Sequence, residues 1–401
     1  MTERAISLSM SARRPQATAN RAENRLKGGA SSGRVGRQPE RTVGAPLDPF
    51  IVYHPIMAQE TRDDSKTTIY DVAEHAGVAI STVSRVLNDS RDVSDSTREI
   101  VLKAIQKLQF RPNRTAKSLA QRATRTIAVA VPTFTTPFHN ELLKGVRSAL
   151  DGNDLDLLLC DLEWEHPQAT LKKFLARGAM DGLLIAGLQV DEDIAQELQT
   201  LGAPVVLIGT QWEDMDSFYW DEEPGARQAV EHLIELGHTE IGMITTPYDD
   251  NQLRNARVLG YKGALEDVGI PFDETKITQG KTAKHAGFSE EAGYEAMEVL
   301  LEEHPAVTAV FASSDVQAIG AWQAIRHAGR SVPDDIALIG YDDIKISRFI
   351  ELSSVAQNMH DVGEEATNVL LQRLRRSGKD RTMSKLIHPT LKIRASSGGD
   401  E

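Results

Sequence analysis

Two patterns of apolar residues follow one another along the chain. Between positions 68 and 108 the apolar residues recur at helical spacing in three short runs. Beyond Thr126, short continuous apolar runs such as TIAVAVP, MDGLLIAG and AVTAVFASS alternate with longer amphipathic segments. Such alternation indicates parallel strands whose sheets are covered by helices on both faces. The units are too numerous for one compact sheet, so we predict an α/β core of two doubly wound subdomains, with a ligand cleft at the carboxyl ends of their strands.

The first two short runs predict a pair of helices joined by a tight turn. Thr68 and Asp71 have the spacing of a helix N-terminus, and Gly77 ends that helix. A second helix can run from Ile80 to about Asn88. The residues that these helices should bury are Val72, Ala73 and Ala76 in the first and Val83, Val86 and Leu87 in the second, while Ser81, Thr82, Ser84 and Arg85 point outward.

The third run predicts a helix that closes a small core. It begins near Ser94, and its apolar positions follow the i, i+1, i+4, i+5, i+8 spacing of a buried helix face. These positions are Ile100, Val101, Ala104, Ile105 and Leu108. Two helices joined by a glycine-bearing turn and closed by a third form a helix-turn-helix domain.

Residues 1–65 have a different composition from the rest of the chain. They are rich in Arg, Gly, Ala, Ser and Pro and have no apolar period. Such a segment cannot bury enough surface to offset the entropy lost on ordering, so we predict a disordered N-terminal extension. Two interpretations stay open. The segment is a basic arm that strengthens DNA binding, or the start codon has been assigned too far upstream, because Met57 stands just before the patterned region.

The charge of the chain is unevenly distributed. The whole chain carries a net charge of −13, yet residues 66–125 hold 11 Lys and Arg against 6 Asp and Glu, while residues 126–401 hold 24 against 45. Affinity for phosphate groups depends on local charge, so the basic segment is the one expected to meet a polyanion.

Composition and motifs exclude several classes of protein. The single cysteine, Cys160, cannot form an internal disulfide and lies in an apolar run, where we expect a small core side chain. No run approaches the ~18 apolar residues of a membrane span, and the N-terminus lacks the apolar core of a secretory signal, so a cytoplasmic location is expected. The sequence has no GxxxxGK[ST] loop, no GxGxxG after a strand, no HExxH and no spaced Cys/His cluster. We therefore expect no enzymatic activity, no cofactor and no metal.

Several motifs resemble those of the LacI/GalR family of bacterial transcriptional regulators. The resemblance rests on TIYDVAEHAGVAISTVSRVLN, on VSDSTREIVLKAIQKLQFRPNRTAKSLA and on VPDDIALIGYDDI, and it covers residues 66–395. It implies a homodimeric repressor that binds a palindromic double-stranded DNA operator. It also implies a small effector, often a sugar or a nucleoside, bound in a periplasmic-binding-protein-like core. The alternative is a solute-binding protein of a transport system, against which the absent secretory signal and the basic helix-turn-helix count.

The resemblance also implies a division of the chain. The expected parts after the N-terminal extension are a DNA-binding domain at 66–112, a hinge helix and linker at 113–125, an effector-binding and dimerisation core at 126–395 and a tail at 396–401. Crossings of the chain between the two subdomains are expected near residues 221–224, 343–358 and 376–380.

The family pattern assigns DNA contacts to the helix-turn-helix. Ile80, Ser81 and Arg85 match positions that reach base edges in the major groove, where a guanidinium can bind guanine with two hydrogen bonds. Ala79 stands where serine is common in the family, so a helix cap and a phosphate contact are expected to be absent. The other positions that match DNA contacts are Thr68, Tyr70, Thr82, Ser84 and Asn88.

The segment RPNRTAKSLAQR matches the hinge helix of the family, with Asn113 near its start. Leu119 matches a leucine that wedges into the minor groove at the operator centre, and Ala116 would face the partner's hinge. A helix of about two turns is marginal alone in water, so we expect it to order on DNA. The alternative is a flexible linker in which Leu119 covers the core.

The family pattern assigns effector contacts less sharply. Phe138 and His139 follow the first core strand, Arg257 matches an arginine that bonds effector oxygens, and Asp315 matches a carboxylate on the opposing strand end. An arginine and an aspartate flanked by aromatic rings suit a polyhydroxylated ligand, which points to a carbohydrate. Arg257 could instead pair on its own helix, and His139 could be an exposed loop histidine. Further candidates are Thr210, Arg254 and Phe288.

Overall fold

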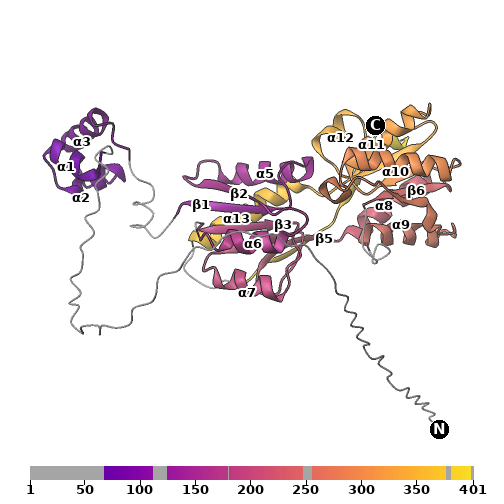
Figure 1. Ribbon diagram of the computed structural model, residues 1–401, viewed down its shortest axis with the longest axis horizontal. Helices are drawn as coiled ribbons and strands as arrows, with labels where there is room; N and C mark the ends of the chain where they lie inside the picture. Colours follow the sequence, from indigo (N-terminus) through magenta and orange to yellow (C-terminus); the bar gives the residue numbers. More distant parts are fainter. Residues whose placement is uncertain (1–66, 112–123, 179, 247–254, 376–380, 399–401) are drawn as a thin grey trace, which may run out of the picture. The chain divides into compact units, whose positions relative to one another are not determined.

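Three short helices open the part of the chain that the structure describes. The computed structural model describes residues 67–111, 124–178, 180–246, 255–375 and 381–398. The first elements are α1 (Ile69–Ala76), α2 (Ile80–Leu87) and α3 (Asp95–Lys107) (Figure 1). They share one small core, to which each helix contributes buried apolar side chains. The predicted helix-turn-helix domain is confirmed.

One residue predicted for this core lies outside it. Ile100 is 51% exposed, whereas its neighbour Val101 is fully buried and Ala104 nearly so. Successive helical residues stand about 100° apart, and two short partner helices cover only a narrow stripe of α3. Ile100 falls beside that stripe, so the prediction for this residue is wrong.

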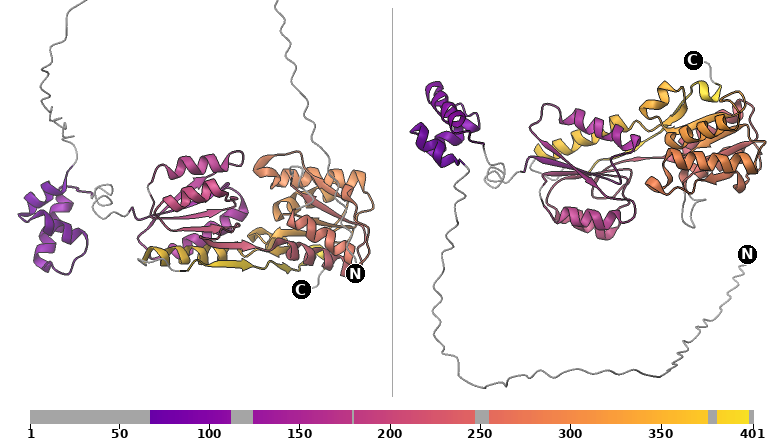
Figure 2. Two further views of the ribbon diagram at one scale, coloured as in Figure 1. Left: turned by 90° about the horizontal axis from the view of Figure 1, so that it is seen from below. Right: turned by 45° about the horizontal axis from the view of Figure 1, so that its top comes forward.

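The first subdomain is built on a six-stranded parallel sheet with the strand order β11-β5-β4-β3-β1-β2. Its strands are β1 (Thr126–Val131), β2 (Asp156–Asp161), β3 (Gly182–Ala186), β4 (Val205–Ile208), β5 (Asp216–Trp220) and β11 (Ser384–Ile387). Its helices are α5 (Pro137–Leu150), α6 (Pro167–Leu175), α7 (Glu192–Thr200) and α13 (Met359–Arg375). Helices α5 and α13 cover one face and α6 and α7 the other (Figure 2).

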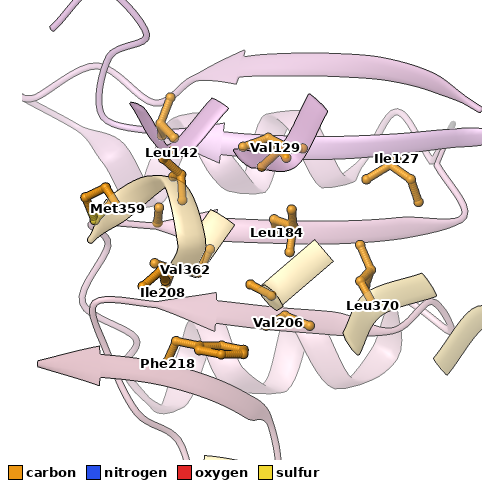
Figure 3. Close-up of a cluster of buried hydrophobic side chains, with 14 of the residues drawn as sticks. Ile127, Val129, Leu142, Leu184, Val206, Ile208, Phe218, Met359, Val362 and Leu370 are labelled. Carbon is orange, nitrogen blue, oxygen red and sulfur yellow. The ribbon is translucent and has the colours of Figure 1, made fainter. Parts of the chain in front are cut away.

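Alternate residues of the central strands enter two separate cores. Val129 packs under α5 and α13, while its neighbour Ala128 faces α6 and α7. Figure 3 shows the first core, in which Leu142 of α5 and Val362 of α13 lie over Val129 and Leu184. Because both faces of a strand are buried, the strands read in the sequence as continuous apolar runs.

The second subdomain repeats this architecture. Its strand order is β12-β10-β9-β8-β6-β7, with β12 alone antiparallel to its neighbour among the described strands. Its strands are β6 (Ile241–Thr245), β7 (Ile277–Gln279), β8 (Ala309–Ala312), β9 (Ala337–Asp342), β10 (Ser353–Ala356) and β12 (Thr390–Lys392). Its helices are α8 (Glu222–Glu235) and α9 (Ala256–Asp267) on one face, α10 (Glu290–Glu303) and α11 (Asp315–His327) on the other, and the short α12 (Lys345–Phe349). The predicted pair of doubly wound subdomains is confirmed.

The edge strand β2 departs from the expected burial. Leu157, Leu158 and Leu159 are 38%, 39% and 40% exposed, although they form one of the most apolar runs of the chain. An edge strand has a neighbour on one side only, so its side chains and half of its backbone groups stay uncovered. Cys160, next along the strand, is buried among apolar side chains as predicted, and burial raises the pKa of its thiol to about 11.

Three segments of chain connect the two subdomains. The first lies at Asp221 between β5 and α8, the second at residues 357–358 between β10 and α13, and the third at residues 388–389 between β11 and β12. The first two agree with the sequence prediction. The third was predicted at 376–380 and is wrong, because β11 pairs with β5 and so extends the first sheet before the chain leaves it.

Hydrogen bonds at the ends of two strands link the regions of these connecting segments. The indole Nε1 of Trp220, the last residue of β5, donates to the carbonyl oxygen of Gln357 in the second segment at 3.0 Å. The backbone N–H of Asp221 donates to the carbonyl oxygen of Ile387, the last residue of β11, at 3.2 Å. The first segment is therefore bonded to the residue that precedes the third, and the residue that precedes the first is bonded to the second.

Glycines allow paired helices to pack closely. A Cβ atom on Gly145 of α5 would lie 1.9 Å from the carbonyl oxygen of His360 in α13. A Cβ atom on Gly320 of α11 would lie 1.9 Å from the carbonyl oxygen of Glu290 in α10. The helix backbones thus approach each other where no side chain has room.

Candidate DNA-binding surface and ligand cleft

The start of the helix-turn-helix is fixed by a reciprocal cap. The Thr68 N–H donates to the Asp71 carboxylate at 2.7 Å, and the Asp71 N–H donates to the Thr68 hydroxyl at 3.4 Å. Gly77 ends α1 in the left-handed conformation, with φ of 65°. Helix α2 then begins after Ala79, whose side chain makes no capping bond, as its residue type predicts.

Helix α2 turns one apolar side inward and one polar side outward. Val83 and Val86 are buried in the small core. Arg85 is exposed, and no described residue forms a hydrogen bond or ion pair with its guanidinium. The other residues assigned to DNA from the sequence are Thr68, Tyr70, Ile80, Ser81 and Asn88, which are exposed, and Thr82 and Ser84, which are half-buried.

A second arginine of this domain has a structural role instead. The guanidinium of Arg98 donates to the Asp89 carboxylate and to the Ser90 carbonyl oxygen, both at 2.7 Å. These bonds tie α3 to the loop that follows α2. Asn113, Ala116 and Leu119 of the predicted hinge lie outside the described residues.

The described residues assigned to an effector lie in the loops and first helical turns that follow the carboxyl ends of strands, where α/β sheets bind ligands. Phe138 and His139 form the first turn of α5, after β1. The His139 ring is buried, its Nδ1 lies 2.7 Å from the Thr136 hydroxyl, and the Phe138 ring meets it edge-on at 5.3 Å. Burial, aided by the nearby His285, lowers the pKa of His139 to about 4. His139 is thus a buried, neutral histidine rather than an exposed one.

Arg257 lies in the first turn of α9, which Asn255 caps. Its Nη2 donates to the Glu222 carboxylate at 2.8 Å, and its Nη1 donates to the carbonyl oxygen of Ser313. The guanidinium stacks on the Tyr341 ring, 3.9 Å from the ring centroid. Its Nε atom is buried and has no hydrogen-bond partner among the described residues. Such a donor is free to bind a ligand oxygen.

Asp315 is occupied by the protein itself. The carboxylate is fully buried at the start of α11 and accepts hydrogen bonds from the Ile344 N–H at 2.8 Å, the Ser347 hydroxyl at 2.6 Å and the Ser354 hydroxyl at 2.5 Å. Burial raises its pKa to about 7, although these three bonds favour the charged form. Its contacts hold α12 and β10 to α11, which is a structural role.

A further carboxyl group that interacts with Arg257 is Asp342, which was not predicted from the sequence. It ends β9 with φ of 110°, and its Oδ1 accepts from the Gln357 amide at 2.8 Å. Burial raises its pKa, and the Arg257 charge opposes that shift. Together with Phe138 it lines a cavity of about 90 Å³. An aspartate at the carboxyl end of the apolar run IALIGYD was the signal in the sequence.

Aromatic side chains of both subdomains also follow or end strands of the two sheets. The rings of Trp164, after β2, and Phe288, before α10, lie 6.5 Å apart with an interplanar angle of 33°. Trp220 lies beside Gly209, and Thr210, the next residue, is buried. The two tryptophans were not singled out from the sequence, although each follows or ends a strand. Arg254 lies outside the described residues.

Within the described ranges no group of three His, Cys, Asp or Glu side chains could hold a metal ion. No described helix is both long enough and apolar enough to cross a membrane.

Two family models match this sequence. The model described as bacterial regulatory proteins, lacI family, matches residues 68–113, and the model described as a periplasmic binding protein-like domain matches residues 230–397. Catabolite control protein A of Priestia megaterium is 32% identical over 327 residues, which are 80% of this chain and 96% of that protein.

Solved structures show the same likeness. The transcriptional regulator CelR in its cellobiose complex is 32% identical, with a TM-score of 0.57 over 82% of this chain and 100% of its own. The Lac repressor dimer bound to operator and the anti-inducer ONPF is 28% identical, with a TM-score of 0.70 over 83% of this chain and 99% of its own. These relatives are transcriptional regulators rather than enzymes.

Proposed function

Because this chain belongs to the LacI family of bacterial regulatory proteins, we propose that it is a cytoplasmic repressor that binds a palindromic operator as a homodimer and responds to a carbohydrate. Family membership itself makes it a DNA-binding transcriptional regulator. The operator symmetry, the dimer and the ligand are the proposal, and each is supported by particular contacts of the described residues.

Recognition of the DNA base sequence is assigned to the exposed side of α2. The guanidinium of Arg85 has no partner within the described domain and can make two hydrogen bonds to guanine in the major groove. Ile80 can contact a thymine methyl group, and the hydroxyl of Ser81 can bond to either kind of base. Of the hinge residues, Leu119 remains assigned to the minor groove by the family pattern. Ala116 remains assigned to the face that meets the partner's hinge, and Asn113 to the start of the hinge helix.

A homodimer is favoured by uncovered apolar side chains in both subdomains. Leu157, Leu158 and Leu159 are exposed along the edge strand β2. In the second subdomain Ile346 and Phe349 of α12 are exposed, Phe349 to 72%. Exposed apolar side chains of this kind suit a protein interface, and a symmetric dimer explains why the operator should be palindromic.

The ligand site is assigned to the cleft that contains Arg257. The observation that carries the assignment is the buried Nε donor of Arg257, which has no described partner and lies in a guanidinium already stacked on Tyr341. Asp342 offers carboxylate oxygens, and Trp164 and Phe288 offer apolar ring faces. Directed polar bonds and a covering ring are what a sugar requires, and the CelR relative binds cellobiose.

Two measurements on the purified protein test this function. Selection of DNA from a random library should yield a palindrome, which the protein binds more tightly than scrambled DNA at the same salt concentration. Thermal-shift screening against cellobiose, ribose and other sugars should find a ligand that raises the melting temperature and changes operator affinity. Equal affinity for selected and scrambled DNA would refute the operator assignment, and a ligand that leaves operator affinity unchanged would refute the control.

A further inference from the structure

The cation of the ligand cleft is already paired with a carboxylate of the same chain. Glu222 Oε1 lies 2.8 Å from Nη2 of Arg257, and the side chain of Arg257 is 11% exposed while that of Glu222 is 32% exposed. Glu222 is the first residue of α8 and directly follows the connecting segment at Asp221. The pair is therefore formed where water has limited access, and its two charges largely cancel.

The other described titratable groups around Arg257 supply no second cation for this site. Asp342 is a second buried carboxyl group that interacts with Arg257. The neighbouring Asp343 is held by Arg394 at 2.6 Å and by Arg348 at 3.3 Å, so those two cations are engaged outside this pair. His139 is neutral because its pKa is about 4. The Arg257 guanidinium thus interacts with two carboxyl groups, and no other described cation forms an ion pair with either of them.

This arrangement of charges distinguishes anionic ligands from neutral ones. A carboxylate or phosphate would have to displace Glu222 from Arg257 and would leave Glu222 unpaired beside Asp342, at the cost of a partly buried, uncompensated charge. A neutral ligand with hydroxyl groups has no such cost. It can accept from Nε of Arg257 and donate to Asp342 while the ion pair stays intact.

We propose that Glu222 is a specificity-determining residue, which reserves the cleft for uncharged, hydroxyl-rich ligands and keeps carboxylates and phosphates away from Arg257. This inference rests on the proposed function, in that the cleft is taken to bind the effector. It adds the residue that selects uncharged over anionic ligands.

The test asks whether removing one charge creates an anion site. Glu222→Gln keeps an oxygen that can accept from Arg257 but removes the negative charge. Titrating inorganic phosphate against chloride at constant ionic strength, with thermal unfolding as the readout, should stabilise Glu222→Gln and leave the wild-type protein unchanged. We expect phosphate to bind the variant at least ~10-fold more tightly than the wild type, and to lose this gain in the double variant Glu222→Gln, Arg257→Ala.

Glu223→Gln is the matched control, because it makes the same charge change one residue along α8. Its carboxylate forms no hydrogen bond or ion pair with a described residue, so phosphate should not stabilise this variant. A folded Glu222→Gln that ignores phosphate, or a wild type that binds it equally well, overturns the inference. If the glutamine variant does not fold, the same phosphate titration is carried out on Glu222→Ala, with the same expected and contradicting results.

A second arm separates this inference from the proposed function. The wild-type protein is titrated with ribose and with ribose 5-phosphate, and its operator binding is measured in parallel. Preference for the phosphorylated sugar overturns the role of Glu222 but leaves the regulator intact. Loss of sequence-specific DNA binding by the wild type would instead refute the proposed function, whatever phosphate does to the variants.

Discussion

At the scale of single residues, two arginines of the helix-turn-helix illustrate how partners define a role. Arg98 is held by Asp89 and Ser90 and fastens α3 to the loop after α2. Arg85 has no described partner and projects from the exposed side of α2. An arginine without a partner in the protein is available to DNA. It loses rotamer entropy only when it binds, and charge-assisted hydrogen bonds to DNA then offset that loss.

Arg85→Ala should reduce operator discrimination while weak, salt-sensitive binding to any DNA persists. Loss of a two-bond contact with guanine costs ~1 to 3 kcal/mol, or roughly a 5- to 150-fold fall in the ratio of operator to scrambled affinity. Gel shifts at fixed salt measure that ratio. Lys103→Ala, which removes a charge from the exposed face of α3, is the control and should leave the ratio unchanged. An unaltered ratio in Arg85→Ala would remove this residue from base reading.

The two buried aspartates should respond differently to substitution. Asp342→Ala removes an acceptor of the proposed ligand site, so it should weaken effector binding ~10-fold or more with a modest change in stability. Asp315→Ala leaves the Ile344 N–H and two serine hydroxyls without their acceptor, so it should lower the free energy of unfolding by ~1 to 3 kcal/mol. Calorimetric titration and urea unfolding of both variants distinguish the roles. The reverse pattern would restore Asp315 as the effector contact.

His139 should make the core sensitive to acid. Its pKa is about 4 in the folded protein, against an ordinary value of 6.5, so between these pH values the unfolded chain binds more protons than the folded one. Stability must therefore fall as the pH falls through this window, by about 2 kcal/mol between pH 7 and pH 5. Asp315, with its raised pKa, acts in the opposite direction.

The contribution of His139 is isolated by comparison with His139→Asn, which can still bond to the Thr136 hydroxyl. Urea unfolding at pH 5 and pH 7 should show a smaller loss for the variant than for the wild type. Equal losses in the two proteins would mean that His139 is protonated in the folded state at pH 5.

At the scale of elements, the helices and most strands follow from local pattern. Val83 and Val86 are buried because helical period and core position agree, and Val129 and Ala128 are both buried because the strand is covered on two faces. The exposure of Ile100 does not follow from the local pattern, because the width of the buried stripe on α3 depends on how much of it the partner helices cover. The exposure of the β2 leucines could not be predicted either. It depends on the position of β2 at the edge of the sheet, and the sequence of a strand does not encode the order of strands.

The cleft was predictable only in part. Phe138 and Arg257 follow from the family pattern, but pairing of Arg257 with Glu222 joins residues 35 positions apart in sequence. Asp315 and Asp342 both end or follow apolar strands, and nothing local distinguishes the carboxylate that interacts with Arg257 from the one held by Ser347 and Ser354. Tertiary neighbours make that distinction.

Gly320 provides a test of the close helix packing. A methyl group at this position would lie 1.9 Å from the Glu290 carbonyl oxygen, so Gly320→Ala must push α10 and α11 apart. We expect a loss of about 1 to 3 kcal/mol in the free energy of unfolding, measured by urea titration. Gln323→Ala, on the exposed side of the same helix, should change it by less than about 0.5 kcal/mol. Similar values for the two variants would contradict the packing argument.

At the scale of the whole molecule, the proposed function depends on how copies of the chain associate. Residues 126–401 hold 24 Lys and Arg against 45 Asp and Glu, so this net negative core is poorly suited to DNA. In the proposed dimer, two basic helix-turn-helix domains are brought to one operator by contacts made elsewhere. Apolar surface on β2 and α12 is the part of the described core best suited to those contacts.

Leu158→Lys should therefore dissociate the dimer and weaken operator binding at least ~10-fold, because a buried lysine at an interface is costly. Sedimentation velocity reports the first effect and gel shifts the second. Leu236→Lys is the control, since Leu236 is an exposed leucine at the end of α8, away from β2. A Leu158→Lys protein that remains dimeric would exclude β2 from the interface.

The three bonded connecting segments also determine where a ligand acts. Glu222 stands one residue beyond the first segment, and Gln357 lies within the second. Groups of the proposed ligand site are therefore attached directly to the connecting segments, which would act as the pivot between the two subdomains. Force applied close to a pivot has a short lever arm, and a small displacement there becomes a large one at the far ends of the two subdomains. A ligand that moves these residues by a fraction of an ångström would thus produce a larger displacement at the DNA-binding end of the molecule. Substitutions that weaken the hydrogen bonds of the connecting segments should reduce the effect of the ligand on operator affinity without changing a residue that contacts the ligand.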